Sequence, residues 1–491
     1  MKTFNQYLNE FEEIGFVEEV IHSLVIVSGL PGAFPHEIIV FESGQIGEVF
    51  TLSSDSVTVL LFSKESLKIG TRATRTNQTL QIPVDENFLG HVINPLGITI
   101  DNSKPPNHKD SQKRFVHQNP SDLHTRALIS QSCETGVSLV DMMIPLGRGQ
   151  RELIIGDRKT GKSNFLLKTV LTQAGQGVIC VYTTIGKKKQ DIKKAHEFFQ
   201  KHGVSKNVVI VASNSQDSAG MIYITPYTAI TIAEYFKDTG KHVLIVLDDL
   251  TMHAKYYREI SLLSKRFPGR NSYPGDIFYV HAKLLERSGN FKTDKGDVSI
   301  TCLSVAETMQ GDLTGYIQTN VMSMTDGHIF FDSDLFAKGR RPAINPFLSV
   351  TRVGKQTQTI VRREINRELS SFLTLFDKMQ NYIHFGAELS DNIKLTLSTG
   401  NKILTFFDQS PFMVVPHNIQ MVLFCVLWSN GWEGKTNDEM RSEMDFLIDV
   451  YKKNKQFKDT VDGLVSNAKS FNDLINKAKL ATPEILGYTK K

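Results

Sequence analysis

The chain has 491 residues, of which 40% are hydrophobic and 22% are charged, proportions typical of a globular protein with a large core. Its formal net charge of +4 is too weak to indicate a nucleic acid or a membrane surface as a partner. Four scattered cysteines argue against a disulfide framework or a metal site built on thiols. The N-terminus is acidic and no segment reaches the roughly 18 apolar residues of a membrane span. We therefore expect a cytoplasmic protein that reaches a membrane only through its partners.

Residues 1–16 form a short amphipathic lead, and a series of short β segments follows over residues 17–100. These segments are rich in Val, Ile, Thr and Phe and are separated by turn residues. They cover residues 23–28, 37–41, 48–52, 57–62 and 71–76. Short strands at this spacing predict a small β-barrel. Residues 101–126 are polar and contain three prolines, which is the composition of a linker.

Residues 127–354 alternate between apolar β runs and helical patterns, which predicts a mainly parallel sheet covered by helices. Apolar residues then recur every three or four positions from residue 355 to the end. The expected fold is multidomain: an N-terminal small β-barrel, a central α/β P-loop (RecA-like) nucleotide-binding domain and a C-terminal all-α domain.

A phosphate-binding loop lies in the central domain, between an apolar β run and a helical pattern. It has the pattern G-x-x-x-x-G-K-[ST], in which glycines let backbone N–H groups approach a triphosphate, lysine reaches the phosphates and a hydroxyl binds Mg²⁺. Its residues are Gly156, Asp157, Arg158, Lys159, Thr160, Gly161, Lys162 and Ser163. The pattern predicts binding of ATP or ADP at a helix N-terminus.

A nucleotide-hydrolysing site also needs a carboxylate near the metal and a group that activates water. Asp248 follows the apolar run 243–247 and fits the first role, so we expect Ser163 and Asp248 to hold Mg²⁺ or its water shell. The water-activating carboxylate is expected after the run 178–186, where this chain has Lys187. A protonated lysine accepts no proton, and only Asp191 lies nearby. The sequence therefore predicts nucleotide binding without efficient turnover.

Five segments resemble the alpha subunit of the F-type rotary ATP synthase head. They are residues 140–163, 226–238, 268–287, 316–327 and 341–354, and the likeness runs from about residue 15 to about residue 400. The resemblance implies an alternating ring of three alpha-type and three beta-type subunits around a gamma-like central shaft. In that family the alpha sites bind nucleotide without turning it over, and the beta subunits hold most of the catalytic sites.

The resemblance also implies roles for single residues. Arg352 matches the arginine that an alpha subunit contributes in trans to the neighbouring beta site, where it would neutralise charge on the γ-phosphoryl group. Phe336, Arg341 and Pro342 match residues that surround the adenine, and Gln409 is a further match beside a shortened loop. At Lys187 the family pattern has glutamine in alpha and glutamate in beta subunits.

The chain departs from the family pattern in two regions that contact other subunits in that family. The lead before the barrel is short and acidic, and the C-terminal helices match only loosely. They suggest a divergent copy serving a specialised rotary motor, with other stalk or motor-specific subunits.

The sequence leaves two alternative functions open. One is a catalytic ring ATPase, either beta-type or an export-type homohexamer, and the other is an RNA-translocating ring helicase. Lys187 argues against the first and the near-neutral charge against the second.

Overall fold

The computed structural model describes residues 2–101, 111–294, 296–384 and 391–488. The chain folds into two compact units, each built from separate segments. The first contains Met1–Leu128, Gly149–Arg158 and Gln173–Asp326, and the second contains Ile129–Arg148, Lys159–Thr172 and Gly327–Lys491. Both units therefore draw on the central region that the sequence assigns to one nucleotide-binding domain.

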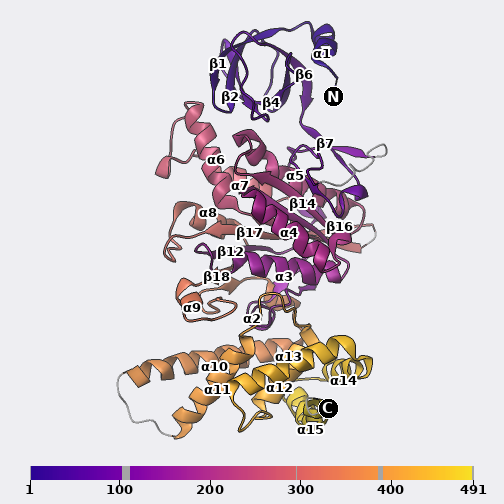
Figure 1. The fold of residues 1–491 in the computed structure, drawn as a ribbon, viewed down its shortest axis with the longest axis vertical. Coiled ribbons are helices and arrows are strands. Elements are labelled where there is room, and N and C mark those ends of the chain that lie inside the picture. Colours follow the sequence, from indigo (N-terminus) through magenta and orange to yellow (C-terminus); the bar gives the residue numbers. More distant parts are fainter. Residues whose placement is uncertain (1, 102–110, 295, 385–390, 489–491) are drawn as a thin grey trace. The chain divides into compact units, whose positions relative to one another are not determined.

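The N-terminal strands close into a barrel in the order β1-β2-β5-β4-β3-β6 (Figure 1). Their bounds are Gly15–Ile21, Leu24–Ser28, Glu37–Phe41, Ile46–Leu52, Ser56–Leu61 and Arg72–Thr79 for β1 to β6. Neighbouring strands pair antiparallel, and inward residues such as Val25, Val59 and Phe41 are fully buried. Helix α1 (Phe4–Phe11) packs Phe4 and Tyr7 against Val40. The predicted small barrel is confirmed.

The barrel ends earlier than the sequence suggests. Strands β7 (Gln81–Val84) and β9 (Gln112–Phe115) form a separate antiparallel pair, and β8 (Val92–Ile93) pairs parallel with β14 (Val208–Asn214) of the central sheet. The expected barrel boundary at residue 100 was therefore wrong, because the pairing partner of so short a strand is not encoded locally. Part of the expected linker 101–126, residues 102–110, lies outside the described residues.

A parallel sheet forms the core of the first unit, with strands in the order β12-β17-β15-β13-β14-β8. The other strand bounds are Arg151–Gly156 (β12), Ile179–Lys187 (β13), Val243–Asp248 (β15) and Gly296–Glu307 (β17), and β16 (Gly289–Thr293) pairs antiparallel with β17. The helices of this unit are α4 (Lys189–Lys201), α5 (Ala219–Asp238), α6 (Leu250–Leu263), α7 (Ile277–Leu285) and α8 (Tyr316–Met324). These strands are almost entirely buried, as expected for a parallel sheet covered by helices.

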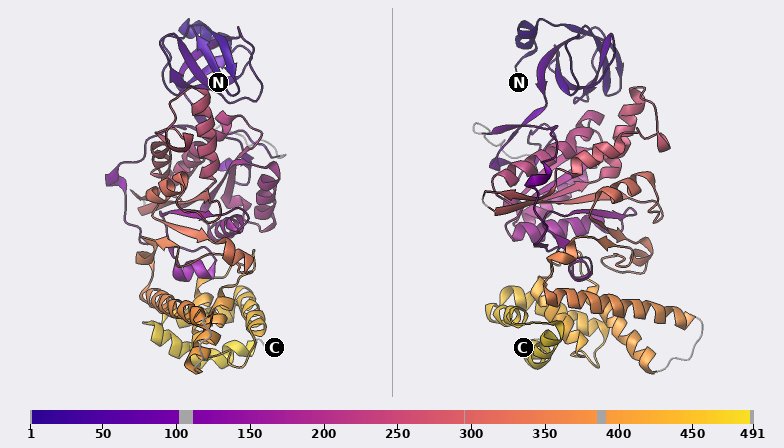
Figure 2. Two further views of the ribbon diagram at one scale, coloured as in Figure 1. Left: turned by 90° about the vertical axis from the view of Figure 1, so that its left-hand side faces the viewer. Right: turned by 180° about the vertical axis from the view of Figure 1, so that it is seen from behind.

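The second unit is mostly helical (Figure 2). Its long helices are α10 (Ile360–His384), α11 (Asp391–Phe407), α12 (His417–Trp428), α13 (Asn437–Lys453), α14 (Lys455–Ser466) and α15 (Phe471–Gly487). Shorter elements are β10 (Ser132–Cys133), α2 (Ser138–Met143), β11 (Leu146–Gly147), β18 (Gly327–Phe331), α9 (Ser333–Ala337) and β19 (Val350–Thr351). Asn366 on α10 donates hydrogen bonds to the carbonyls of Met142 and Met143 at 2.7 and 2.9 Å. Such contacts join residues 129–148 to the C-terminal helices, which begin with α10 at Ile360.

None of the helices in the described ranges is long and apolar enough to cross a membrane.

Candidate functional site

The phosphate-binding loop connects the end of β12 to the start of helix α3 (Lys162–Gly175). The backbone turns through left-handed conformations at Lys159, with φ of 64°, and at Gly161, with φ of 103°. Glycine adopts such a conformation without steric cost. Because α3 begins at Lys162, the N-terminus of the helix lies at the end of the loop, where the helix dipole favours an anion. The predicted order of strand, loop and helix is confirmed.

The first two side chains of the loop contact the end of β17 and the segment that follows it. The carboxylate of Asp157 accepts hydrogen bonds from the Thr308 hydroxyl at 2.5 Å and from the Gly311 N–H at 3.0 Å. Arg158 is largely exposed, and its Nε lies 2.7 Å from a carboxylate oxygen of Glu307. These contacts indicate that Asp157 fixes the loop backbone. Its contact with the nucleotide stays a prediction.

Lys187, the last residue of β13, lies between the carboxylate of Asp248, which ends β15, and that of Asp249, the next residue. Its Nζ is 2.8 Å from Oδ1 of Asp248 and 2.9 Å from Oδ2 of Asp249. Strands β13 and β15 are parallel neighbours, and Thr184 pairs with Asp248, so residues after their carboxyl ends meet at one edge of the sheet. This adjacency brings together a lysine and two aspartates that lie about 60 positions apart in the sequence.

The two carboxylates keep Lys187 in its charged form. Burial lowers the pKa of Lys187, but the charges of Asp248 and Asp249 outweigh burial and raise it above its ordinary value. The ammonium group is therefore protonated at neutral pH and has no lone pair with which to activate water. Asp191, the substitute considered from the sequence, is exposed in the first turn of α4. The edge of the sheet thus presents a cation at the position expected for a general base.

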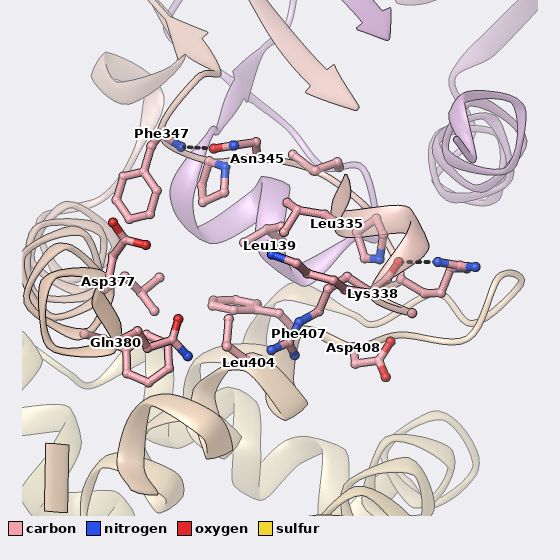
Figure 3. A pocket seen from close by; sticks show the side chains of 18 residues that line it. Leu139, Leu335, Lys338, Asn345, Phe347, Asp377, Gln380, Leu404, Phe407 and Asp408 are labelled. Carbon is pink, nitrogen blue, oxygen red and sulfur yellow. Dashed lines mark hydrogen bonds between the residues drawn. The ribbon is translucent and has the colours of Figure 1, made fainter. Parts of the chain in front are cut away.

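A cavity of about 700 Å³ in the second unit contains part of the expected adenine site (Figure 3). Arg341 and Pro342 line it together with apolar side chains that include Leu335, Phe347 and Phe407. This volume and apolar lining are typical of a small-molecule pocket. The Arg341 guanidinium carbon lies 3.6 Å from the centre of the Phe336 ring, a cation–π contact. Phe336 is therefore beside the cavity and positions Arg341.

Gln409 is buried next to this cavity. Among the described residues, the hydrogen bonds of its side-chain amide all go to backbone groups. Its amide nitrogen donates to the carbonyl of Gly136 at 2.8 Å and to that of Met413, and its side-chain oxygen accepts from the N–H of Ser138 at 3.2 Å. The side chain therefore connects residues 136–138 to the segment 409–413 of the second unit. The structure places it in the support of the cavity, next to the adenine residues of the sequence analysis.

We expect Gln409→Ala to lower the free energy of unfolding by about 1–3 kcal/mol, because buried backbone groups lose their partners. Urea unfolding followed by circular dichroism measures this loss, and fluorescent ATP-analogue titration measures affinity in the same preparations. A reduced affinity with unchanged stability would contradict this structural role and favour direct contact with the nucleotide.

Arg352 lies in the bend directly after β19, and its side chain is exposed. The Thr351 hydroxyl donates to the Pro145 carbonyl at 2.9 Å and accepts from the Gly354 N–H at 3.1 Å. A Cβ added to Gly354 would lie 1.6 Å from the Pro145 carbonyl oxygen, so only glycine fits there. These contacts fix the backbone on both sides of Arg352 and leave its guanidinium group directed to the surface.

Comparison with known proteins gives a consistent result. Residues 136–351 match the nucleotide-binding domain of the ATP synthase alpha/beta family. The chain is 35% identical over 472 residues to the ATP synthase subunit alpha of Sulfurovum sp. (strain NBC37-1), covering 94% of this chain and 93% of that protein. The chain belongs to the ATP synthase alpha-subunit family. The alpha subunits of Helicobacter acinonychis and Helicobacter pylori (strain G27) are each 37% identical over 415 residues, covering 84% of this chain and 82% of theirs.

This family membership confirms the resemblance found in the sequence and a nucleotide-binding role in a rotary ATPase. Two features of the site have no clear signal in the amino-acid sequence. The ion pairs of Lys187 with Asp248 and Asp249 follow from strand order, for which the sequence has no local signal. Residues of α10 and α11 also line the cavity, among them Asp377 and Phe407. In the sequence these residues have the pattern of an ordinary amphipathic helix.

Proposed function

We propose that the chain is a nucleotide-binding, largely non-catalytic alpha-type subunit of an F-type-like rotary ATPase hexamer. It supplies Arg352 to the catalytic site of a neighbouring beta-type subunit and supports coupled ATP hydrolysis or synthesis. The observation that carries the proposal is the pairing of Lys187 with Asp248 and Asp249 at 2.8 and 2.9 Å. Because a protonated lysine occupies the position of a water-activating group, the chain's own site binds nucleotide without hydrolysing it efficiently.

The bound nucleotide is ATP or ADP. The loop from Gly156 to Ser163 binds its phosphates, and Arg341 and Pro342, with Phe336 behind Arg341, bind its adenine. Hydroxyl and carboxylate oxygens are the ligands that Mg²⁺ takes in phosphate sites, so Ser163 and Asp248 fit the ion. When bound, Mg²⁺ neutralises phosphate charge. Since Asp248 also bonds Lys187, we propose that it acts mainly on the water shell of the ion.

The partners in this proposal are a beta-type subunit in an alternating three-plus-three ring and a gamma-like central shaft. The complex lies on the cytoplasmic face of a membrane and contacts the bilayer through other subunits. The loosely matching C-terminal helices favour a specialised motor over a standard synthase. Purification of the native complex tests this part, because copurification of the usual peripheral-stalk and membrane-ring subunits would contradict specialisation.

For the purified chain alone, we expect binding of ATP in equilibrium dialysis and hydrolysis well below about one turnover per second, the lower end for working phosphoryl-transfer enzymes. The coexpressed ring with a beta-type partner should hydrolyse ATP at ordinary rates in the same coupled assay. Turnover near or above one per second by the isolated chain would contradict the proposal and support a catalytic ring ATPase. Salt-dependent RNA binding would support the helicase alternative.

A further inference from the structure

Three side chains in the first unit meet outside the nucleotide site, at the base of the barrel. His36 lies in the turn before β3, Glu48 lies on β4, and His117 follows β9. Nδ1 of His36 is 2.6 Å from Oε1 of Glu48, and Nε2 of His117 is 3.0 Å from the same carboxylate. Within the described parts of the chain, one ligand atom from each of the three lies within 4.8 Å of the others.

We propose that His36, Glu48 and His117 bind one divalent transition-metal ion of the Zn²⁺ class. Two imidazoles and one carboxylate are a recognised ligand set for Zn²⁺ and for non-haem Fe²⁺, with one position left for water. Ligand–metal distances of 2.0–2.2 Å in tetrahedral geometry separate the ligand atoms by about 3.3 Å. The His36–Glu48 and His117–Glu48 separations of 2.6 and 3.0 Å therefore need to widen by less than about 1 Å, and the separation of the two imidazole ligand atoms, which is at most 4.8 Å, has to reach the same value. Rotation of the half-exposed His36 side chain can provide this adjustment.

The surroundings of the three ligands suit a metal site. The Glu48 side chain is 4% exposed and that of His36 is 48% exposed, so a buried anionic ligand lies next to a route from solvent. The two imidazoles and the carboxylate bind a metal ion in their deprotonated forms.

The backbone and rings hold the ligands in place. His36 has a left-handed conformation, with φ of 65°, and its N–H donates to the Val49 carbonyl at 3.0 Å. A non-glycine residue in this conformation is uncommon and costs free energy. The His117 ring lies 4.4 Å from the His36 ring and 5.2 Å from the Tyr227 ring, measured between centroids. These contacts restrict the rotation of His117.

The segment that carries His117 is also fixed to the central sheet's helices. The carbonyl of Val116 accepts a hydrogen bond from Nη1 of Arg287 at 3.0 Å, and Arg287 pairs with Glu234 on α5 at 2.6 Å. A metal ion bound to His36, Glu48 and His117 would thus connect two strands or turns of the barrel to α5 through Val116. We expect such an ion to stabilise the barrel against local unfolding, since it binds only the folded arrangement.

The test uses the full-length chain after removal of metal by chelation. Zn²⁺ is titrated in competition with a chromophoric chelator, bound zinc is counted by elemental analysis, and the thermal midpoint is recorded with and without Zn²⁺. The variants are His36→Asn, Glu48→Gln and His117→Asn. Asparagine tolerates the left-handed backbone at residue 36. His22→Asn is the matched control, because His22 is an exposed barrel histidine with φ of 54°.

We expect about one Zn²⁺ per wild-type chain, an increased thermal midpoint with Zn²⁺, and at least tenfold weaker binding in each of the three variants. The His22→Asn protein should bind as the wild type does. Absence of stoichiometric binding by the wild type would overturn the proposal and leave a hydrogen-bonded His–Glu–His cluster. Binding that persists unchanged in the variants would overturn it as well, since the zinc would then lie elsewhere. If Glu48→Gln fails to fold, the zinc affinity of His36→Asn tests the proposal. The His36 side chain is half exposed, so its replacement should leave the fold intact.

Discussion

Replacing Arg352 by alanine should reduce ATP hydrolysis by the coexpressed ring by a factor of about 10³ or more, the range for loss of an arginine finger. In the proposed function, the guanidinium group stabilises charge on the transferring phosphoryl group of the neighbouring site, and its backbone is held by contacts among Thr351, Pro145 and Gly354. The measurement is steady-state ATPase activity of rings whose assembly has been verified by size-exclusion chromatography. The chain's own nucleotide binding should be unchanged.

Two control variants make this experiment specific. Arg352→Lys keeps the positive charge but loses the planar fork of donors, so we expect only partial recovery of activity. Arg367→Ala removes an arginine on α10 whose side chain is 74% exposed and lies 3.5 Å from Glu368, and it should leave the rate unchanged. Full activity of an intact ring carrying Arg352→Ala would refute a catalytic role in trans.

Replacing Lys187 by methionine should destabilise the first unit by about 3–5 kcal/mol, the cost of breaking a buried ion pair by removing one partner. Asp248 and Asp249 would remain buried side by side without a counter-charge, and burial already raises the pKa of Asp249. Thermal unfolding by calorimetry measures the change. The matched control is Lys193→Met, since Lys193 is 75% exposed and its pair with Glu197 is long, at 3.7 Å.

Mg²⁺ distinguishes loss of charge from loss of packing in the same variant. If the two carboxylates lack only a cation, millimolar Mg²⁺ should raise the thermal midpoint of Lys187→Met more than that of the wild type. A variant as stable as the wild type would contradict the role that we assign to the ion pairs. If the variant is destabilised and Mg²⁺ does not raise its thermal midpoint, the lost stability comes from the packing of the lysine side-chain methylenes.

Local patterns identified most of the elements correctly. The barrel strands, the strand–loop–helix order around Gly156 to Ser163 and the amphipathic helices of the C-terminal third depend on residues close together in the sequence. The boundary of the barrel was wrong because β8 pairs with β14, more than 100 residues later. Apolar segments as short as β8 can pair with many strands, and only the assembled sheet selects one of them.

The sequence by itself determined the family, the phosphate-binding loop and the absence of a base at Lys187, because each depends on residue identity within a contiguous motif. Only the tertiary structure decided what these residues contact. The parallel pairing of β13 with β15 places Lys187 between Asp248 and Asp249, and barrel closure places His36 and Glu48 beside His117. The physical reason is that contacts between strands are set by hydrogen-bond register and packing across the whole unit, for which no short segment carries the information.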